Sequence, residues 1–412
     1  MKNLRKYISL LSIITVLTII LAACGSKAEE SAGKQAVTEE TKAAEDTTST
    51  AGETNKTTDQ SKEETVDAAD QTTEEAAGSA ETAAAKAVST EDKKPIKILY
   101  SAGLCGIPLH LAKQLQFYEA EGLVEGVDYE YLTSSTPGVE MLSAGQADVT
   151  FGLIAAMLAP LDNGLEAKTV LGVHTGCIQI VAGKETGITD ITGLKGKKIG
   201  VEQLASSSHI VTQRALASVG IGSTADKMEV EFVVFSKDNL PLALKNGAVD
   251  AIAIGDPQAT ILVNEGSGVS IFNSATSDLL KDEYCCALWV RNEALEKNPD
   301  QIAKVVQAIQ KTSAWIDQNV DLAAEIQLDN EWLVGDLEID RHTISTFKYL
   351  PSVSGVKEAL TRNILDMKEL GLIKADTDAE ALAKNSFFLL EGVPDNISET
   401  VVPPIDPESQ LK

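Results

Sequence analysis

The chain has 412 residues and a hydrophobic content of 43%, so it is long enough to bury two sizeable cores. Its formal net charge is -26. Nucleic acid is therefore an unsuitable partner, because binding to the phosphate backbone needs clustered Lys and Arg.

The first 24 residues have the organisation of a bacterial export signal. Basic residues near the start precede an apolar run over residues 8–21, which is too short to span a membrane comfortably. The run ends in LAACG, which resembles a lipobox with Cys24 as the lipidated residue. We expect a lipoprotein signal peptide over 1–24 and an acyl anchor on the extracytoplasmic face of the cell membrane. The alternative is an ordinary secretory signal with a chance cysteine.

Residues 25–94 are rich in Ala, Glu, Thr, Ser and Lys and contain no aromatic residue. Such a segment cannot bury enough apolar surface to offset its chain entropy. We predict a disordered acidic tether that charge repulsion keeps extended.

Two similar segments indicate an internal duplication. LSAGQADVTFG begins at Leu142 and LKNGAVDAIAIG begins at Leu244, and their glycines Gly145 and Gly247 are 247 − 145 = 102 residues apart. Each copy predicts a helix ended by Gly, a turn and a buried strand. Two α/β lobes of similar design would explain the repeat, although any two α/β units share some of this turn chemistry.

Between these landmarks the pattern predicts alternating strands and helices. Strands are expected over 96–100, 129–132, 149–151 and 230–235. A helix should start near Pro108 and continue to Gly122. A second helix should follow Ser206, and Asp238 or Asn239 should cap a third. Residues 292–392 should be mostly helical.

Five segments in this order resemble one family of solute-binding proteins. They are PLHLAKQLQFYEAEGL, SAGQADVTFG, ITGLKGKKIGVE, LKNGAVDAIAIGDP and NPDQIAKVVQAIQKTSAWI. Together they resemble the SsuA/THI5 (NMT1-like) family, over about residues 96–388. Members serve ABC importers of sulfonates, nitrate, taurine or thiamine-precursor pyrimidines.

This resemblance implies an α/β, two-lobed type II periplasmic-binding-protein fold. Each lobe would be a mixed sheet flanked by helices. Lobe 1 would comprise 95–176 and 285–392, with its C-terminal helices packed on it. Lobe 2 would comprise 177–284, and an irregular tail would follow over 393–412. The chain would cross between lobes near 170–180 and return near 285–290.

Ligands of open α/β sheets bind beyond the carboxyl ends of the strands. The candidate ligand-binding residues are therefore Ser101, Gly103, Leu104, Cys105, Ser134, Ser135, Thr136, Gly152, Leu153, His174, Thr175, Ser206, Ser207, Ser208, His209 and Asp256. The stretch from Ser206 to His209 offers hydroxyls and helix-start N–H groups to an anion, or it simply caps the helix. The resemblance implies that Asp256 closes the cleft. No Arg lies in these loops, which favours a neutral, monoanionic or zwitterionic ligand.

Four cysteines besides Cys24 fall near the expected cleft, namely Cys105, Cys177, Cys285 and Cys286. Three interpretations stay open: a soft site for a metal or thiophilic ligand assisted by His174 and His209, a disulfide, or buried apolar thiols. The spacing matches no zinc signature, so we expect no metal and no cofactor.

The sequence favours a binding protein without catalytic residues. It would be a monomer that closes on a small-molecule ligand by hinge motion and delivers it to the transmembrane permease of an ABC importer. The alternatives are an enzyme like the pyrimidine synthases of the same family, and a ligand-sensing subunit of a membrane receptor.

Overall fold

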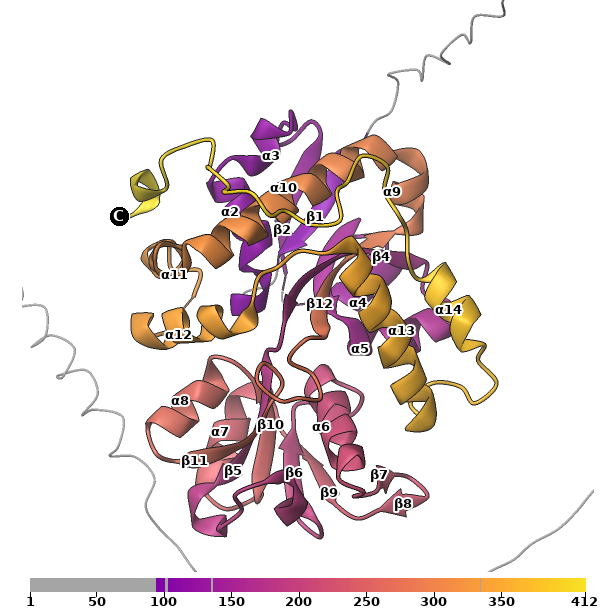
Figure 1. Ribbon diagram of the computed structural model, residues 1–412, viewed down its shortest axis with the longest axis vertical. Coiled ribbons are helices and arrows are strands. Elements are labelled where there is room, and N and C mark those ends of the chain that lie inside the picture. Colours follow the sequence, from indigo (N-terminus) through magenta and orange to yellow (C-terminus); the bar gives the residue numbers. More distant parts are fainter. Residues whose placement is uncertain (1–93, 101–102, 135, 334) are drawn as a thin grey trace, which may run out of the picture. The chain divides into compact units, whose positions relative to one another are not determined.

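A computed structural model describes residues 94–412 except 101, 102, 135 and 334 (Figure 1). The predicted signal peptide and the predicted lipidation site Cys24 lie outside these residues. So does the predicted tether, apart from Lys94 at its end. Within the described part of the chain, no helix combines the length and apolarity needed to cross a membrane.

Two five-stranded sheets form the framework, and their strand orders match. The first sheet runs β2 (Tyr129–Thr133), β1 (Ile96–Tyr100), β3 (Val149–Leu153), β12 (Tyr284–Arg291), β4 (Ala167–Thr175). The second runs β9 (Glu231–Val234), β6 (Lys198–Val201), β10 (Ala251–Gly255), β5 (Ile178–Gly183), β11 (Gly268–Asn273). In both sheets the first three strands are parallel and the fourth is antiparallel to its neighbours. The duplication inferred from sequence is thus visible as shared topology.

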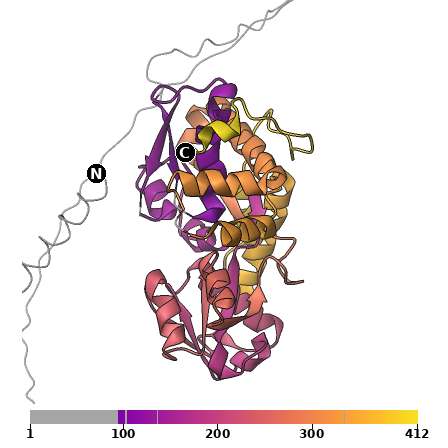
Figure 2. The ribbon, with the colours of Figure 1, turned by 90° about the vertical axis from the view of Figure 1, so that its left-hand side faces the viewer.

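We call the first sheet and its helices the first lobe. Its helices are α2 (Ile107–Gln114), α3 (Phe117–Ala120), α4 (Gly138–Ser143), α5 (Ile154–Asp162), α9 (Asn292–Lys297), α10 (Pro299–Gln318), α11 (Val320–Asp329), α12 (Leu337–Phe347), α13 (Val353–Glu369) and α14 (Ala379–Asn385). The second lobe is the second sheet with α6 (Ser207–Ser218), α7 (Leu240–Lys245), α8 (Gln258–Asn264) and the hairpin β7 (Ser223–Thr224) and β8 (Lys227–Met228). Figure 1 shows the first sheet in the upper half of the view and the second sheet in the lower half, and the turned view of Figure 2 shows the same division. The chain passes between the lobes from β4 to β5 and from β11 to β12.

Five 3-10 turns complete the described elements: η1 (Leu104–Gly106), η2 (Lys184–Thr186), η3 (Ile191–Leu194), η4 (Lys237–Asn239) and η5 (Pro407–Gln410). From residue 393 onward η5 is the only regular element. This tail lies along α10, where Gln310 donates to the carbonyl of Pro394 at 2.8 Å.

Two local predictions were wrong. The helix expected to run to Gly122 is broken, because Gln116 is left-handed with φ 59° and separates α2 from α3. Asn239 does not cap α7, since its side chain donates to the hydroxyl of Ser236 instead.

Helix α6 contributes to the packing of both lobes. Its residues Ala215 and Leu216 belong to the core beneath the second sheet, whereas Ile210 and Val211 pack into apolar clusters of the first lobe. Even its polar residues between Ser207 and Arg214, among them Thr212 and Gln213, are buried. The helix is therefore enclosed on more than one side.

The ring of Tyr284, at the start of β12, is held between two glycines. A Cβ atom built on Gly172 would lie 2.6 Å from the ring, and one on Gly355 would lie 2.3 Å from it. The Tyr284 hydroxyl donates to the carbonyl of Leu350. The ring thus packs β12 against β4 and the start of α13.

Candidate ligand-binding site

Four thiols converge where the two lobes are joined. The Sγ of Cys177 lies 3.5 Å from that of Cys285 and 3.9 Å from that of Cys286. The thiols of Cys105, Cys177 and Cys286 all lie within 4.8 Å of one another. A ring nitrogen of His174 forms a second such group with Cys285 and Cys286. The convergence expected from sequence is confirmed, except that His209 belongs to neither group.

The backbone around Cys177 is fixed by its neighbours. Gly176 has φ 52°, and a Cβ there would lie 2.2 Å from the Cα of Ala275. The hydroxyl of Ser274 accepts hydrogen bonds from the amides of Cys177 at 3.0 Å and Ile178 at 2.9 Å. This turn carries the chain from β4 to β5 and holds Cys177 against β12.

Cys285 and Cys286 are adjacent on a strand, where side chains normally point to opposite faces. The pairing of β12 with β4 shifts register on both sides of Cys286. Because the strand is irregular at this point, both thiols can lie beside Cys177 although the two residues are adjacent.

The thiols differ in acidity. Burial raises the pKa of Cys285, but hydrogen bonds with Cys177 and Cys286 outweigh it and lower this pKa. Burial, aided by the neighbouring thiols, raises the pKa of Cys286 well above its ordinary value. Cys285 is therefore the more acidic thiol of this pair.

His174 is fully buried and stacks on aromatic rings. Its ring lies 5.0 Å from that of Phe347 and 5.7 Å from that of Phe151. Nδ1 lies 3.0 Å from the carbonyl oxygen of Thr175 and 3.7 Å from the Sγ of Cys285. Within residues 94–412 as described, Nε2 has no hydrogen-bond partner.

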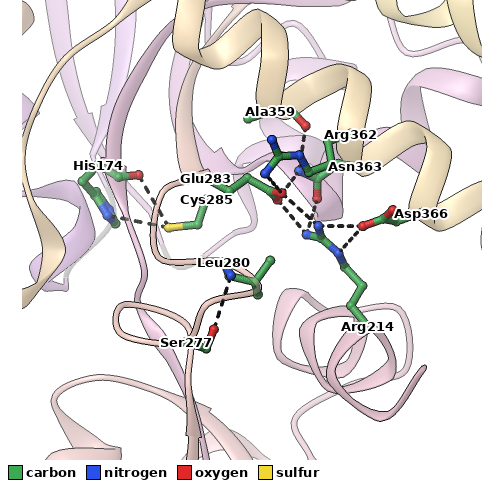
Figure 3. Close-up of polar contacts among 10 residues, drawn as sticks. All are labelled: His174, Arg214, Ser277, Leu280, Glu283, Cys285, Ala359, Arg362, Asn363 and Asp366. Carbon is green, nitrogen blue, oxygen red and sulfur yellow. Dashed lines mark hydrogen bonds and ion pairs between the residues drawn. The ribbon is translucent and has the colours of Figure 1, made fainter. Parts of the chain in front are cut away.

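A buried ion-pair network joins the lobes beside these thiols (Figure 3). Arg214 of α6 donates to both carboxylate oxygens of Glu283, at 2.7 and 2.9 Å, and to Asp366 of α13 at 2.8 Å. Asn363 donates to Glu283 at 2.8 Å. Burial opposes the charge of Arg214, but Glu283 and Asp366 outweigh it, so the pKa of Arg214 is raised.

A small cavity lies between the thiols and this network. It encloses about 20 Å³, which is room for about one water molecule. Its lining comes from both lobes: Leu153, Ala155, Gly176, Ile178, Val211, Arg214, Ser274, Leu280, Glu283, Cys285 and Asn363.

The hydroxyl-rich start of α6 caps its own helix. The Oγ of Ser206 accepts from the amide of His209 at 3.4 Å and lies 3.1 Å from the Oγ of Ser208. The Nδ1 of His209 accepts from the amide of Ala205 at 3.0 Å, and its ring packs against Phe232. Burial lowers the pKa of His209 to about 4.

Asp256 is also engaged within the second lobe. Its carboxylate accepts from Gln179 at 2.9 Å and from the hydroxyl and amide of Thr260 at 2.8 and 3.0 Å. Burial raises its pKa, and the hydrogen bonds from Gln179 and Thr260 oppose that rise.

The remaining predicted site residues are dispersed. Leu153 lines the cavity, and the Gly152 carbonyl accepts from Trp289. The carbonyl of Gly103 accepts a turn hydrogen bond from the amide of Gly106. Leu104 and Ser207 are buried. The hydroxyl of Thr175 donates to the carbonyl of Phe347. Ser134 accepts from the amide of Thr136 at 2.9 Å. Ser101 and Ser135 lie outside the described residues.

Sequence reasoning missed the charged side of the cavity. Arg214 lies inside α6, and its partners Glu283 and Asp366 lie 69 and 152 residues further along the chain. No local pattern connects them. A usable signal is that Arg214 is the lone Arg of the helix expected after Ser206, because an Arg that becomes buried requires an acidic partner.

The model of the NMT1-like family matches residues 89–328. This chain belongs to the NMT1-like family. A Bacillus subtilis (strain 168) protein named for binding aliphatic sulfonates is 26% identical over 227 residues, which are 54% of this chain and 66% of that protein. The match thus spans slightly less than two thirds of that relative's length.

Solved structures similar to this NMT1-like chain show its fold. The periplasmic aliphatic sulphonate binding protein SsuA from Escherichia coli has a TM-score of 0.59 at 16% identity, over 76% of this chain and 98% of that one. The periplasmic nitrate-binding protein NrtA from Synechocystis PCC 6803 has a TM-score of 0.57 at 16% identity, over 71% and 86%. The chain has a periplasmic-binding-protein fold, as the resemblance implied. These relatives are named as binding proteins, not as enzymes.

Proposed function

We propose that this protein is the solute-binding component of an ABC importer. It is held on the extracytoplasmic face of the membrane by lipid on Cys24 and delivers a small solute of the sulfonate, nitrate or pyrimidine type to a permease. Family membership and the sulfonate- and nitrate-binding relatives support this role.

The cavity shared by the two lobes is the observation that carries the proposal. Solute pockets typically enclose roughly 300–1,000 Å³, far more than the about 20 Å³ found here. The lobes therefore separate to admit solute and close around it, turning about β4–β5 and β11–β12.

The lining favours a small monoanion or zwitterion with an apolar part. Helix α5 begins at Ile154, and its N-cap residue Leu153 lines the cavity and provides no side-chain cap. The first N–H groups of α5 can therefore donate to an anionic oxygen. Ala155 and Val211 supply apolar contact. The charge of Arg214 is already paired by Glu283 and Asp366, which disfavours a multiply charged anion.

Calorimetry and thermal unfolding of the full chain carrying Cys24→Ser test the proposal. The panel holds butanesulfonate, taurine, nitrate and an aminopyrimidine, with sulfonates tested first. A bound solute at 100 times its Kd should stabilise the protein by about 2.7 kcal/mol. Ala155→Leu, which fills the cavity, should abolish the stabilisation by solute, whereas Ala120→Leu at an exposed position of α3 should preserve it.

If a solute stabilised Ala155→Leu as much as the parent protein, binding in this cavity would be contradicted. If no member of the panel stabilised the protein, the proposed solute class would be contradicted. For the anchor, Cys24→Ser should move the protein from the membrane fraction to the soluble fraction of the producing cells.

A further inference from the structure

The four clustered thiols have a geometry that packing alone does not require. Buried cysteines usually act as small apolar side chains. Here four of them come from three separate segments, and an irregular β12 aims two consecutive side chains at Cys177.

The spacing of the thiols suits one metal ion. A tetrahedral ion with metal–sulfur bonds of about 2.3 Å has sulfur atoms roughly 3.8 Å apart. The Sγ atom of Cys177 lies 3.5 and 3.9 Å from those of Cys285 and Cys286. Cys105 adds a fourth thiol on the side of Cys177 and Cys286, within 4.8 Å of both, while Cys285 lies beside these same two thiols.

The surroundings also fit an ion held by thiolates. His174 is 0% exposed and borders the thiols, since a ring nitrogen groups with Cys285 and Cys286 and its Nδ1 lies 3.7 Å from the Sγ of Cys285. Sulfur ligands select closed-shell thiophilic ions such as Zn²⁺ and Cu⁺ over Mg²⁺ or Ca²⁺.

We propose that Cys105, Cys177, Cys285 and Cys286 bind one thiophilic metal ion of the Zn²⁺ or Cu⁺ type at the junction of the lobes. Binding replaces thiol protons by metal–sulfur bonds, and the protons leave to solvent without any redox change. Cys177 lies on the β4–β5 connection, and Cys285 and Cys286 lie at the start of β12. The ion therefore ties together the two connections between the lobes.

Cadmium titration of the full chain tests this site. The protein carries Cys24→Ser, so that only these four of its five cysteines remain, and it is reduced and freed of metal under anaerobic conditions. One Cd²⁺ per chain should bind with a thiolate-to-cadmium absorption band. Competition with a chelator then measures the affinity of the site for Zn²⁺ and for Cu⁺ separately, which shows which of the two ions it prefers.

Cys177→Ser and Cys285→Ser should each weaken Cd²⁺ binding by more than roughly 100-fold, because loss of even an outer partner costs 10–100-fold. Thr312→Ser, an equally small change at a buried position in α10, should leave binding unchanged. Circular dichroism checks that each variant is folded.

Three results would overturn the proposal. They are absence of the cadmium band, equal affinity in a folded Cys177→Ser variant, and a Cys177–Cys285 disulfide by mass spectrometry combined with no Cd²⁺ binding after reduction. The solute panel is measured on the same preparation, so failure of the metal site and failure of the solute-binding role are distinguishable.

Discussion

Arg214 donates two hydrogen bonds to the carboxylate of Glu283, from Nη1 to Oε1 at 2.7 Å and from Nη2 to Oε2 at 2.9 Å. Arg214 belongs to α6 of the second lobe, whereas Glu283 directly precedes β12 of the first. Both side chains are only 4% exposed. Such a pair is costly to break, because either partner alone is an uncompensated buried charge.

Glu283→Gln should therefore lower the free energy of unfolding by about 3–5 kcal/mol. Chemical denaturation measures this loss. The same change at Glu231, whose pair with Lys198 is exposed, should cost less than about 1 kcal/mol. Similar losses in the two variants would contradict a structural role for the buried pair.

Acid should destabilise the protein through His209. Burial lowers its pKa to about 4 from an ordinary value of 6.5. The unfolded chain then binds more protons than the folded chain between these pH values, so stability falls as pH drops through that window. Between pH 7 and pH 4, the free energy of unfolding should therefore fall by up to about 3 kcal/mol less in His209→Gln than in the wild type. Chemical denaturation at each pH measures this difference.

His342→Gln is the matched control for His209, because His342 is exposed. Its stability should follow the wild-type pH curve. An unaltered curve in His209→Gln would show that this ring is not the titrating group.

Gly176→Ala should destabilise the protein and disturb the thiol cluster. The new Cβ would lie 2.2 Å from the Cα of Ala275, which cannot move without shifting the backbone. Gly187 also has positive φ, but a Cβ there would have no atom within 4 Å. We expect Gly187→Ala to lower the free energy of unfolding by about 1–2 kcal/mol, and Gly176→Ala to lower it by at least about 2 kcal/mol more. Thermal unfolding compares them, and equal losses would contradict the close packing at Gly176.

Ser206→Ala separates helix capping from ligand binding. As a cap for α6, Ser206 should contribute about 1 kcal/mol to stability and nothing to solute affinity. Ser352→Ala removes the equivalent cap of α13 and should cost a similar amount. A solute affinity that falls in Ser206→Ala alone would favour the ligand-binding interpretation.

The fold was largely predictable because its signals are local. The apolar run from Ile96 to Tyr100 is β1 with the expected bounds. Gly145 and Gly247 have φ 65° and 68° and follow α4 and α7, as the repeated motif required. The break at Gln116 was missed, because a non-glycine residue in the left-handed region carries little sequence signal.

The candidate site was predictable only in part. The topology implied by the family brought Cys105, Cys177 and the pair at 285–286 to one place, and the structure agrees. The partners of Arg214 were not predictable, because an ion pair between distant segments leaves no periodic pattern. Hydroxyls near a helix start indicated a ligand and a cap equally well.

The packing of Tyr284 between Gly172 and Gly355 has an evolutionary consequence. Each glycine leaves room that the ring fills, so a side chain at either position would displace it. The three positions are far apart in the sequence but can change only in concert. Relatives with a small residue in place of Tyr284 should tolerate larger residues opposite it, and relatives that keep the tyrosine should keep both glycines. An alignment would therefore show covariation among these three columns.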